Sequence, residues 1–129
     1  MDSDFPRLQL PAHRLGRAGE EIAARFLIAC GYQLIERNWR GTGGEIDIIA
    51  VDNAIGGDEY VIVEVKTRSS RAFGDPFDAI TPEKYRRLYR LGREWIAAHQ
   101  PHARWRIDVI LLVKSFPGFE IVHHKDVIA

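Results

Sequence analysis

The sequence predicts an α/β fold, and three observations support that prediction. Two stretches with helical periodicity alternate with apolar runs of strand length, in the order helix, three strands, helix, two strands. The 129 residues are 46% hydrophobic and 28% charged, which is ordinary for a globular protein of one domain. No internal repeat or linker divides the chain. We therefore expect an N-terminal tail over residues 1–12 and a single domain over residues 13–129.

The first predicted helix runs from Leu15 to Cys30. Apolar residues recur in it at helical spacing, and Gly31 follows where a glycine commonly ends a helix. Cys30 falls on the apolar stripe, so we expect a small core side chain and not a nucleophile. As the one cysteine of the chain, it excludes an internal disulfide and a multi-cysteine zinc site.

Three predicted strands follow, at residues 32–39, 45–51 and 60–67. In the second strand, alternation places Ile46 and Ile48 on one face and Asp47 on the other. The third strand is apolar on both faces until Glu64 and Lys66, which is typical of a strand at the centre of a sheet.

The second predicted helix begins at Thr81-Pro82, with threonine as the N-cap and proline at the first helical position. It runs to about Ala98. Its core-facing residues are expected to be Tyr85, Leu88, Leu91 and Trp95. Two apolar runs, at residues 106–113 and 119–123, predict the last two strands.

Charge is segregated along the chain although the net charge is zero. Residues 42–65 contain six acids and no lysine or arginine, whereas residues 66–93 contain eight basic residues and three acids. The two segments therefore carry −6 and +5. This pattern suits a cation site beside a phosphate-binding surface, or alternatively two blocks that neutralise each other across the fold.

Acidic residues on the second and third strands point to a metal site. A loop of about eight residues favours antiparallel pairing, and if Val51 faces Tyr60, then Asp47 lies opposite Glu64. Like charges directly opposed across strands are destabilising unless something neutralises them, and a hard cation such as Mg²⁺ accepts carboxylate oxygens. Lys66 shares the face of Glu64 and could orient a metal-bound water or stabilise charge on phosphate.

An ordinary ion pair is the alternative to this metal site. Pairing shifted by two residues would place Asp47 opposite Lys66, and in the unshifted register Glu45 could pair with Lys66. Glu20 lies on the apolar stripe of the first helix, which makes it a candidate for a further metal-organising acid. It is equally typical of an acid in the first helical turn, while Glu21 is expected to pair with Arg25 four residues later.

Five short motifs together resemble a known family. They are Gly16–Glu20, Gly44–Ile49, Val63–Arg68, Thr81–Lys84 and Arg106–Val109. Over most of its length from Leu15 onward, the sequence resembles the YraN-like family of small bacterial proteins, itself similar to archaeal Holliday-junction resolvases and other PD-(D/E)xK nucleases. The resemblance implies a restriction-endonuclease-like α-β-β-β-α-β core, with a mixed central sheet flanked by helices. The chain departs from the superfamily motif in having Ile46, and not proline, before the aspartate.

The resemblance also implies the roles of individual residues. Asp47 and Glu64 would be ligands of Mg²⁺ or Mn²⁺, Lys66 the catalytic lysine and Glu20 the helix acid. Basic residues beyond the lysine are expected to contact phosphates without reading sequence, although each could equally belong to a solvated face. They are Arg68, Arg71, Lys84, Arg86, Arg87 and Arg90.

The expected function is that of a metal-dependent endonuclease acting on structured or branched DNA. One alternative is a nucleic-acid-binding module with little or no cleavage activity. Another is an assembly or adaptor protein that binds a partner through its apolar C-terminal strands. Asp108 could be a third acid or simply pair with Arg106 or with a helix residue, and the neighbouring His123 and His124 should point to opposite faces.

Partners and location follow from the same sequence. The expected partners are nucleic acid, DNA in particular, and a second copy of the chain in a homodimer. No apolar run approaches the roughly 18–20 residues of a membrane span, and residues 1–11 lack the apolar stretch of a secretory signal. We therefore expect a cytoplasmic protein that does not bind membranes.

Overall fold

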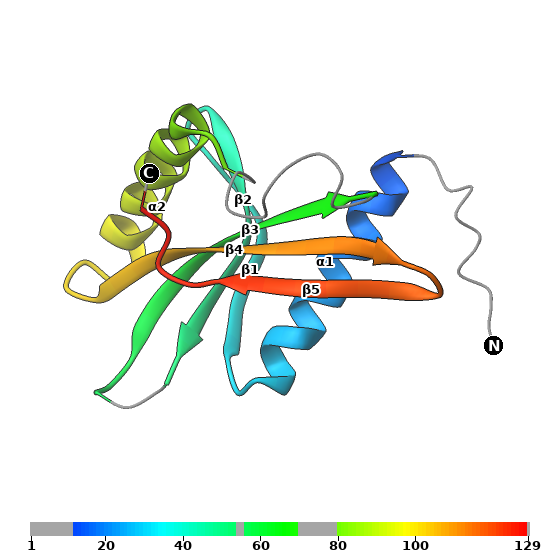
Figure 1. Cartoon of the computed structure of the whole chain (residues 1–129). Helices are drawn as coiled ribbons and strands as arrows, with labels where there is room; N and C mark the ends of the chain where they lie inside the picture. Colours follow the sequence, from blue (N-terminus) through cyan, green and yellow to red (C-terminus); the bar gives the residue numbers. More distant parts are fainter. Residues whose placement is uncertain (1–11, 54–55, 70–79, 129) are drawn as a thin grey trace.

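The computed structural model describes residues 12–53, 56–69 and 80–128. In these residues the chain forms two helices and five strands, in the predicted order (Figure 1). They are α1 (Ala12–Ala29), β1 (Gln33–Gly41), β2 (Gly44–Asp52), β3 (Glu59–Arg68), α2 (Pro82–His99), β4 (Arg104–Ser115) and β5 (Gly118–His124). Each predicted element is present, and its ends differ from the prediction by at most three residues. Of the predicted tail, residues 1–11 lie outside the described residues.

The five strands form one mixed sheet in the order β1-β2-β3-β4-β5, so β3 is central as predicted. Neighbouring strands are antiparallel except for β3 and β4, which are parallel. A parallel pair needs a crossover connection, and α2 supplies it between β3 and β4.

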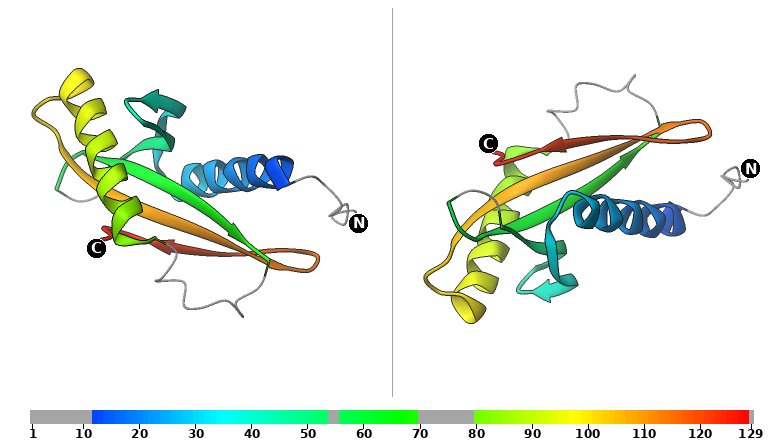
Figure 2. Two further views of the ribbon diagram at one scale, coloured as in Figure 1. Left: turned by 90° about the horizontal axis from the view of Figure 1, so that it is seen from above. Right: turned by 90° about the horizontal axis from the view of Figure 1, so that it is seen from below.

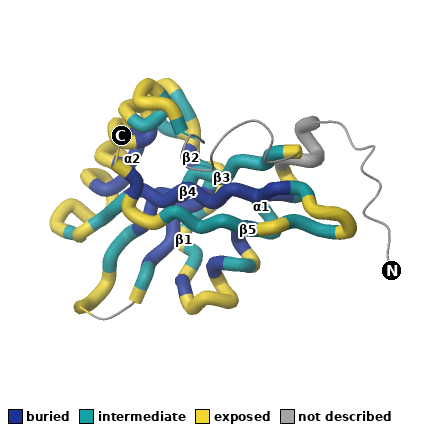
Figure 3. Tube along the Cα trace, in the orientation of Figure 1, coloured by how far each residue is buried: buried dark blue, intermediate teal, exposed yellow. Residues whose placement is uncertain are grey.

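The two helices cover opposite faces of the sheet (Figure 2). On one face, Ala23 and Leu27 of α1 pack with Ile48 and Val63. On the other face, α2 packs on a second set of buried strand residues. Its buried side chains are Leu88, Leu91, Trp95 and Ile96, as predicted for three positions of the stripe. The burial-coloured tube shows β4 buried along most of its length (Figure 3).

Local signals in the sequence fix where α2 begins and where α1 ends. The Lys84 backbone N–H donates to the Thr81 hydroxyl at 3.1 Å, and Pro82 occupies the first helical position. Gly31 follows α1 with φ +94°, a backbone conformation that glycine adopts without strain. Neither described helix is long and apolar enough to cross a membrane.

The prediction for Cys30 was wrong. Its side chain is exposed because α1 ends at Ala29 and the chain turns there. The Cys30 N–H still donates to the carbonyl oxygens of Phe26 and Leu27, at 3.0 and 3.1 Å, so the residue closes the last helical turn. The helical stripe was therefore extended one residue too far.

The prediction that Ile46 shares a face with Ile48 was also wrong. Ile46 packs in the cluster under α2, whereas Ile48 packs under α1. Strict alternation therefore fails between these two residues. The interruption coincides with Asn38 on the neighbouring strand, which has φ +52° and lies opposite Asp47 by the β1–β2 register. A residue with positive φ breaks the regular pleat, and alternation from the sequence cannot anticipate it.

Candidate functional site

The predicted register of β2 and β3 is confirmed. Val51 pairs with Tyr60, and the regular ladder runs as far as Ile48 and Val63. Asp47 comes next along β2, and its carboxylate Oδ2 accepts the Val65 backbone N–H at 2.8 Å. The Asp47 side chain thus points toward the backbone of β3, at the end of the hairpin where the paired ladder stops.

Glu64 and Lys66 lie on β3 beside Asp47, and their side chains form an ion pair. The Lys66 Nζ is 3.1 Å from the Glu64 Oε2, with the two side chains only 17% and 13% exposed. Glu45, in contrast, pairs with Arg40 at 3.3 Å. The ion pair in this region is therefore formed along β3, and neither of the two cross-strand pairs considered from the sequence accounts for Lys66.

The electrostatics of Asp47 reflect its acidic surroundings. Burial raises the pKa of Asp47, and the negative charge of Glu64 raises it further, against the opposing effect of the Val65 hydrogen bond. Glu20 and Glu45 add smaller increases, and the resulting pKa is about 7. Near neutral pH, a nearby positive charge would therefore stabilise the ionised form of the Asp47 carboxyl group.

Glu20 lies on α1 and approaches Asp47 from the face of the sheet that α1 covers. The Asn38 Nδ2 donates to the Glu20 Oε1 at 2.9 Å and so orients its carboxylate. Glu21 instead binds Arg25, as predicted, together with Arg37, both at 2.9 Å. Asn38 was not among the predicted site residues. Asparagine within a predicted strand was the available signal, since asparagine is enriched at positive φ.

Lys84 extends the group from the first turn of α2. The neighbouring Lys66 lowers the pKa of Lys84, with burial adding to the effect, while Glu64 raises it. The residue predicted to contact phosphate therefore lies beside the lysine predicted to be catalytic. We refer to Glu20, Asp47, Glu64, Lys66 and Lys84 as the open-end cluster.

The predicted phosphate-binding arginines are only partly gathered. Thr42 donates from its backbone N–H and its hydroxyl to Glu94, at 2.9 and 3.0 Å, and so ties the β1–β2 hairpin to α2. Arg87 and Arg90 consequently lie against the hairpin glycines. Arg86 is exposed on α2, one helical turn before Arg90, and Arg68 is half-buried at the end of β3. Arg71 lies outside the described residues.

A second set of charges surrounds Arg106 and Asp108 on the α1 side of the sheet. Asp108 is fully buried and accepts from Arg106 Nε at 2.9 Å and from the Asp126 backbone N–H at 2.9 Å, while His123 Nε2 lies 2.7 Å away. Arg106 also contacts the acids at the β2–β3 turn. These further partners, at 2.9–3.1 Å, are Glu59, Asp52 and the Tyr32 hydroxyl. We call this set the Arg106 cluster.

The Arg106 cluster decides between the two interpretations of Asp108. Burial raises the pKa of Asp108, but the hydrogen bonds from His123, Arg106 and Asp126 outweigh it, and the net pKa is lowered. Asp108 therefore pairs with Arg106 inside the fold, which is one of the alternatives predicted from the sequence. Its partners satisfy both carboxylate oxygens.

The open-end cluster has a donor set that fits a hard divalent cation. Within the described ranges, no group of three or more His, Cys, Asp or Glu side chains is placed to hold a metal ion. Mg²⁺ does not need one, because it commonly binds one or two carboxylates and keeps several waters. Asp47 and Glu64 are hard oxygen donors whose mutual repulsion a cation would relieve.

The protein has an α/β fold with a mixed sheet flanked by helices, and its order of elements, beginning α-β-β-β-α-β, fits a nuclease-like core. Residues 19–112 match the model of the uncharacterised protein family UPF0102, the YraN-like family. The chain belongs to this family, as the sequence motifs predicted.

Relatives in other bacteria agree with this assignment. A UPF0102 protein of Mycolicibacterium smegmatis is 52% identical over 111 residues, covering 84% of this chain and 88% of the relative. A UPF0102 protein of Beutenbergia cavernae is 47% identical over 111 residues, covering 85% and 91%. The solved structure of Pyrococcus furiosus SfsA in complex with Ca²⁺ covers 88% of this chain and 63% of its own, with 15% identity. Its TM-score of 0.33 is too low to support an argument.

Proposed function

We propose that this protein is a cytoplasmic, Mg²⁺- or Mn²⁺-dependent endonuclease that acts on structured or branched DNA. The observation that supports it most is the approach of Asp47 to Glu64 where the β2–β3 ladder stops, with Lys66 3.1 Å from Glu64. Arg87 is exposed on α2 and lies close enough to Lys84 to lower its pKa, so positive charge borders the cluster, which suits a polyanionic substrate.

Each residue of the open-end cluster has a chemical role in this proposal. Asp47 and Glu64 would hold the cation, which when bound activates water and neutralises charge on the phosphate. Lys66 would leave Glu64 and donate to the attacked phosphate, where negative charge develops. Glu20, held by Asn38, would orient the water that attacks phosphorus. Lys84 and Arg87 would position the flanking phosphates.

A cleavage assay tests the proposal directly. Linear, flapped and four-way DNA substrates are incubated with the protein in Mg²⁺, Mn²⁺ or EDTA. We expect metal-dependent cleavage that Lys66→Met and Asp47→Asn both abolish. The matched control is Lys125→Met, an exposed lysine outside the cluster. Cleavage that persists in EDTA, or in both cluster variants, would contradict the proposal.

A nucleic-acid-binding module with little or no cleavage is the second candidate, and the surface of α2 favours it. Arg86, Arg87 and Arg90 are exposed and need no metal to bind phosphate. Replacing all three by alanine should weaken DNA binding in EDTA for every sequence and reduce the salt dependence, by a slope of about 0.9 for each lost contact. Arg25→Ala on α1 is the control, and an unchanged salt slope in the triple variant would exclude this face.

A further inference from the structure

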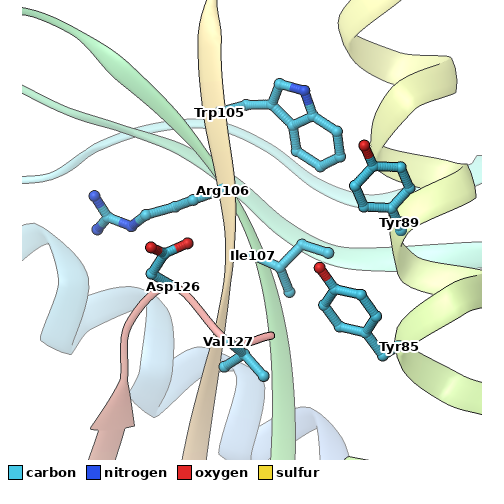
Figure 4. A pocket seen from close by; sticks show the side chains of 7 residues that line it. All are labelled: Tyr85, Tyr89, Trp105, Arg106, Ile107, Asp126 and Val127. Carbon is cyan, nitrogen blue, oxygen red and sulfur yellow. The ribbon is translucent and has the colours of Figure 1, made fainter. Parts of the chain in front are cut away.

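A small aromatic pocket lies between α2, β4 and the segment after β5. Its volume is about 210 Å³. In Figure 4 the rings of Tyr85, Tyr89 and Trp105 stand on one side of β4, whereas Arg106 and Asp126 point to the other side. The pocket shares no lining residue with the open-end cluster.

The walls of the pocket are braced by the fold. The Tyr89 ring lies 5.2 Å from Trp105 and 6.2 Å from Tyr85, both tilted, so the three rings support one another. Val127 closes one wall, and its backbone N–H donates to the Ile107 carbonyl at 2.8 Å. A pocket held in this way can accept a ligand without first having to be ordered.

The chemistry of the lining favours a flat, heteroaromatic ligand. Tyr89 remains 45% exposed, so part of its ring is open to a stacking partner. Polar groups make up more of the pocket's lining than apolar groups do, and they include the hydroxyl groups of both tyrosines (Figure 4). At about 210 Å³ the pocket is smaller than the roughly 300–1,000 Å³ that drug-sized ligands occupy, which suits a single ring system.

Positive charge borders the pocket on the surface of α2. Arg86 and Arg93 are exposed and lie three residues before and four residues after Tyr89. Side chains at these spacings are neighbours on a helix, so both arginines flank the exposed tyrosine. Aromatic rings for stacking, bordered by cations for phosphate, are the features with which proteins bind single strands.

We propose that this pocket binds an unpaired nucleobase, which stacks on Tyr89 while Arg86 and Arg93 contact the adjoining phosphates. The inference rests on the proposed function and narrows its substrate to DNA with a single-stranded portion. It requires no metal and no cleavage, so it can be tested separately from the endonuclease.

The test uses a duplex whose single-stranded overhang contains 2-aminopurine, a base whose fluorescence falls when it stacks. Binding is measured in EDTA. The wild type should quench the fluorescence and bind the overhang more tightly than a blunt duplex. Tyr89→Ala should weaken overhang binding about 5- to 100-fold and leave blunt-duplex binding within twofold, whereas Tyr89→Phe should stay within threefold of the wild type. Phe116→Ala removes an exposed aromatic ring outside the pocket and should change nothing.

Four further outcomes overturn the assignment or separate it from the endonuclease. Equal binding of an overhang made of abasic sites would overturn base recognition. If the free 2-aminopurine nucleotide binds as tightly as the overhang does, the pocket binds free nucleotides and not a base within a strand. A folded Tyr89→Ala variant that binds and quenches like the wild type would exclude the pocket. Base-specific overhang binding without cleavage in Mn²⁺ would support the pocket while contradicting the endonuclease.

Discussion

The open-end cluster and the Arg106 cluster use similar residues in opposite ways. Both place carboxylates and a cation at half-buried or buried positions of the sheet. In the Arg106 cluster every oxygen of Asp108 has a partner, and the pKa of Asp108 is lowered although the residue is fully buried. In the open-end cluster Asp47 faces other acids, and its pKa rises to about 7.

The difference indicates which cluster is stable within the protein alone and which one would gain from an added cation. A buried charge with complete hydrogen bonding is stable within the protein alone. Carboxylates that repel one another cost stability unless an external cation compensates them. The two clusters differ in position: Asp52 and Glu59 lie near the turn of the β2–β3 hairpin, roughly 16 Å of strand from Asp47, whereas Asp108 lies on β4 beside Val63, one residue before Glu64 in the parallel register.

The largest expected effect is on the Arg106 cluster. Asp108→Asn removes the charge that Arg106 and His123 share, and leaves a buried cation with weaker compensation. Breaking one side of a buried pair typically costs about 3–5 kcal/mol, and urea unfolding at pH 7 should show a loss of this size. Asp58→Asn, at an exposed acid near the turn, is the control. A loss below about 1 kcal/mol would mean that the cluster is not a structural anchor.

The open-end cluster should respond with the opposite sign. The pKa of Asp47 in the folded protein lies above its unfolded value of 3.8, so its contribution to stability is complete below that value and is lost as pH rises through about 7. In EDTA at pH 8, Asp47→Asn should therefore be more stable than the wild type, by up to about 4 kcal/mol. Thermal melts from pH 4 to pH 8 would measure this. If raising the pH from 4 to 8 destabilises the wild type and Asp47→Asn equally, the neighbouring acids do not destabilise ionised Asp47.

Divalent cations should reduce that difference in stability. Because a ligand that binds only the folded state stabilises it, Mn²⁺ at 100 times its dissociation constant should add about 2.7 kcal/mol to the wild type. Asp47→Asn, which lacks one anionic ligand, should gain much less, and Asp58→Asn should gain as much as the wild type. Calorimetric titration with Mn²⁺, compared with melts in EDTA, checks the expectation. If Mn²⁺ stabilises Asp47→Asn fully, Asp47 is not a ligand.

The smallest effect concerns the order of the neighbouring acids. Glu64 raises the pKa of Asp47 more than Glu20 does. Glu64→Gln should therefore lower the Asp47 titration midpoint more than Glu20→Gln, and both variants should fold. Carboxyl chemical shifts followed by NMR across pH report each midpoint. The reverse ranking would mean that Glu20, and not the strand acid, dominates the field at Asp47.

The parts of this molecule governed by short-range rules could be predicted. The Thr81 cap, Gly31 and the β2–β3 register depend on adjacent residues and on a short turn, and all three are as predicted. Long-range or conformational features escaped prediction. Arg106 also binds Asp52 of β2 and Glu59 of β3, which no spacing in the sequence connects to it.

A backbone irregularity explains the other missed features. Strand alternation assumes an unbroken pleat, but Asn38 has positive φ and lies opposite Asp47. The face of Ile46 and the contact that holds Glu20 both depend on that irregularity. Neither composition nor periodicity reports a single residue with positive φ. The acids of the cluster were therefore predicted, whereas Asn38, which orients Glu20, was not.

The parallel pairing of β3 with β4 has a consequence during synthesis. The strands β1, β2 and β3 are joined by short turns and can pair as soon as they leave the ribosome, but the partner on the other edge of β3 comes 36 residues after Arg68, at Arg104. At about 5–20 residues per second, the apolar edge of the central strand stays unpaired for roughly two to seven seconds. During that interval β3 is an open template for another nascent chain, and α2 and β4 must close it before aggregation does.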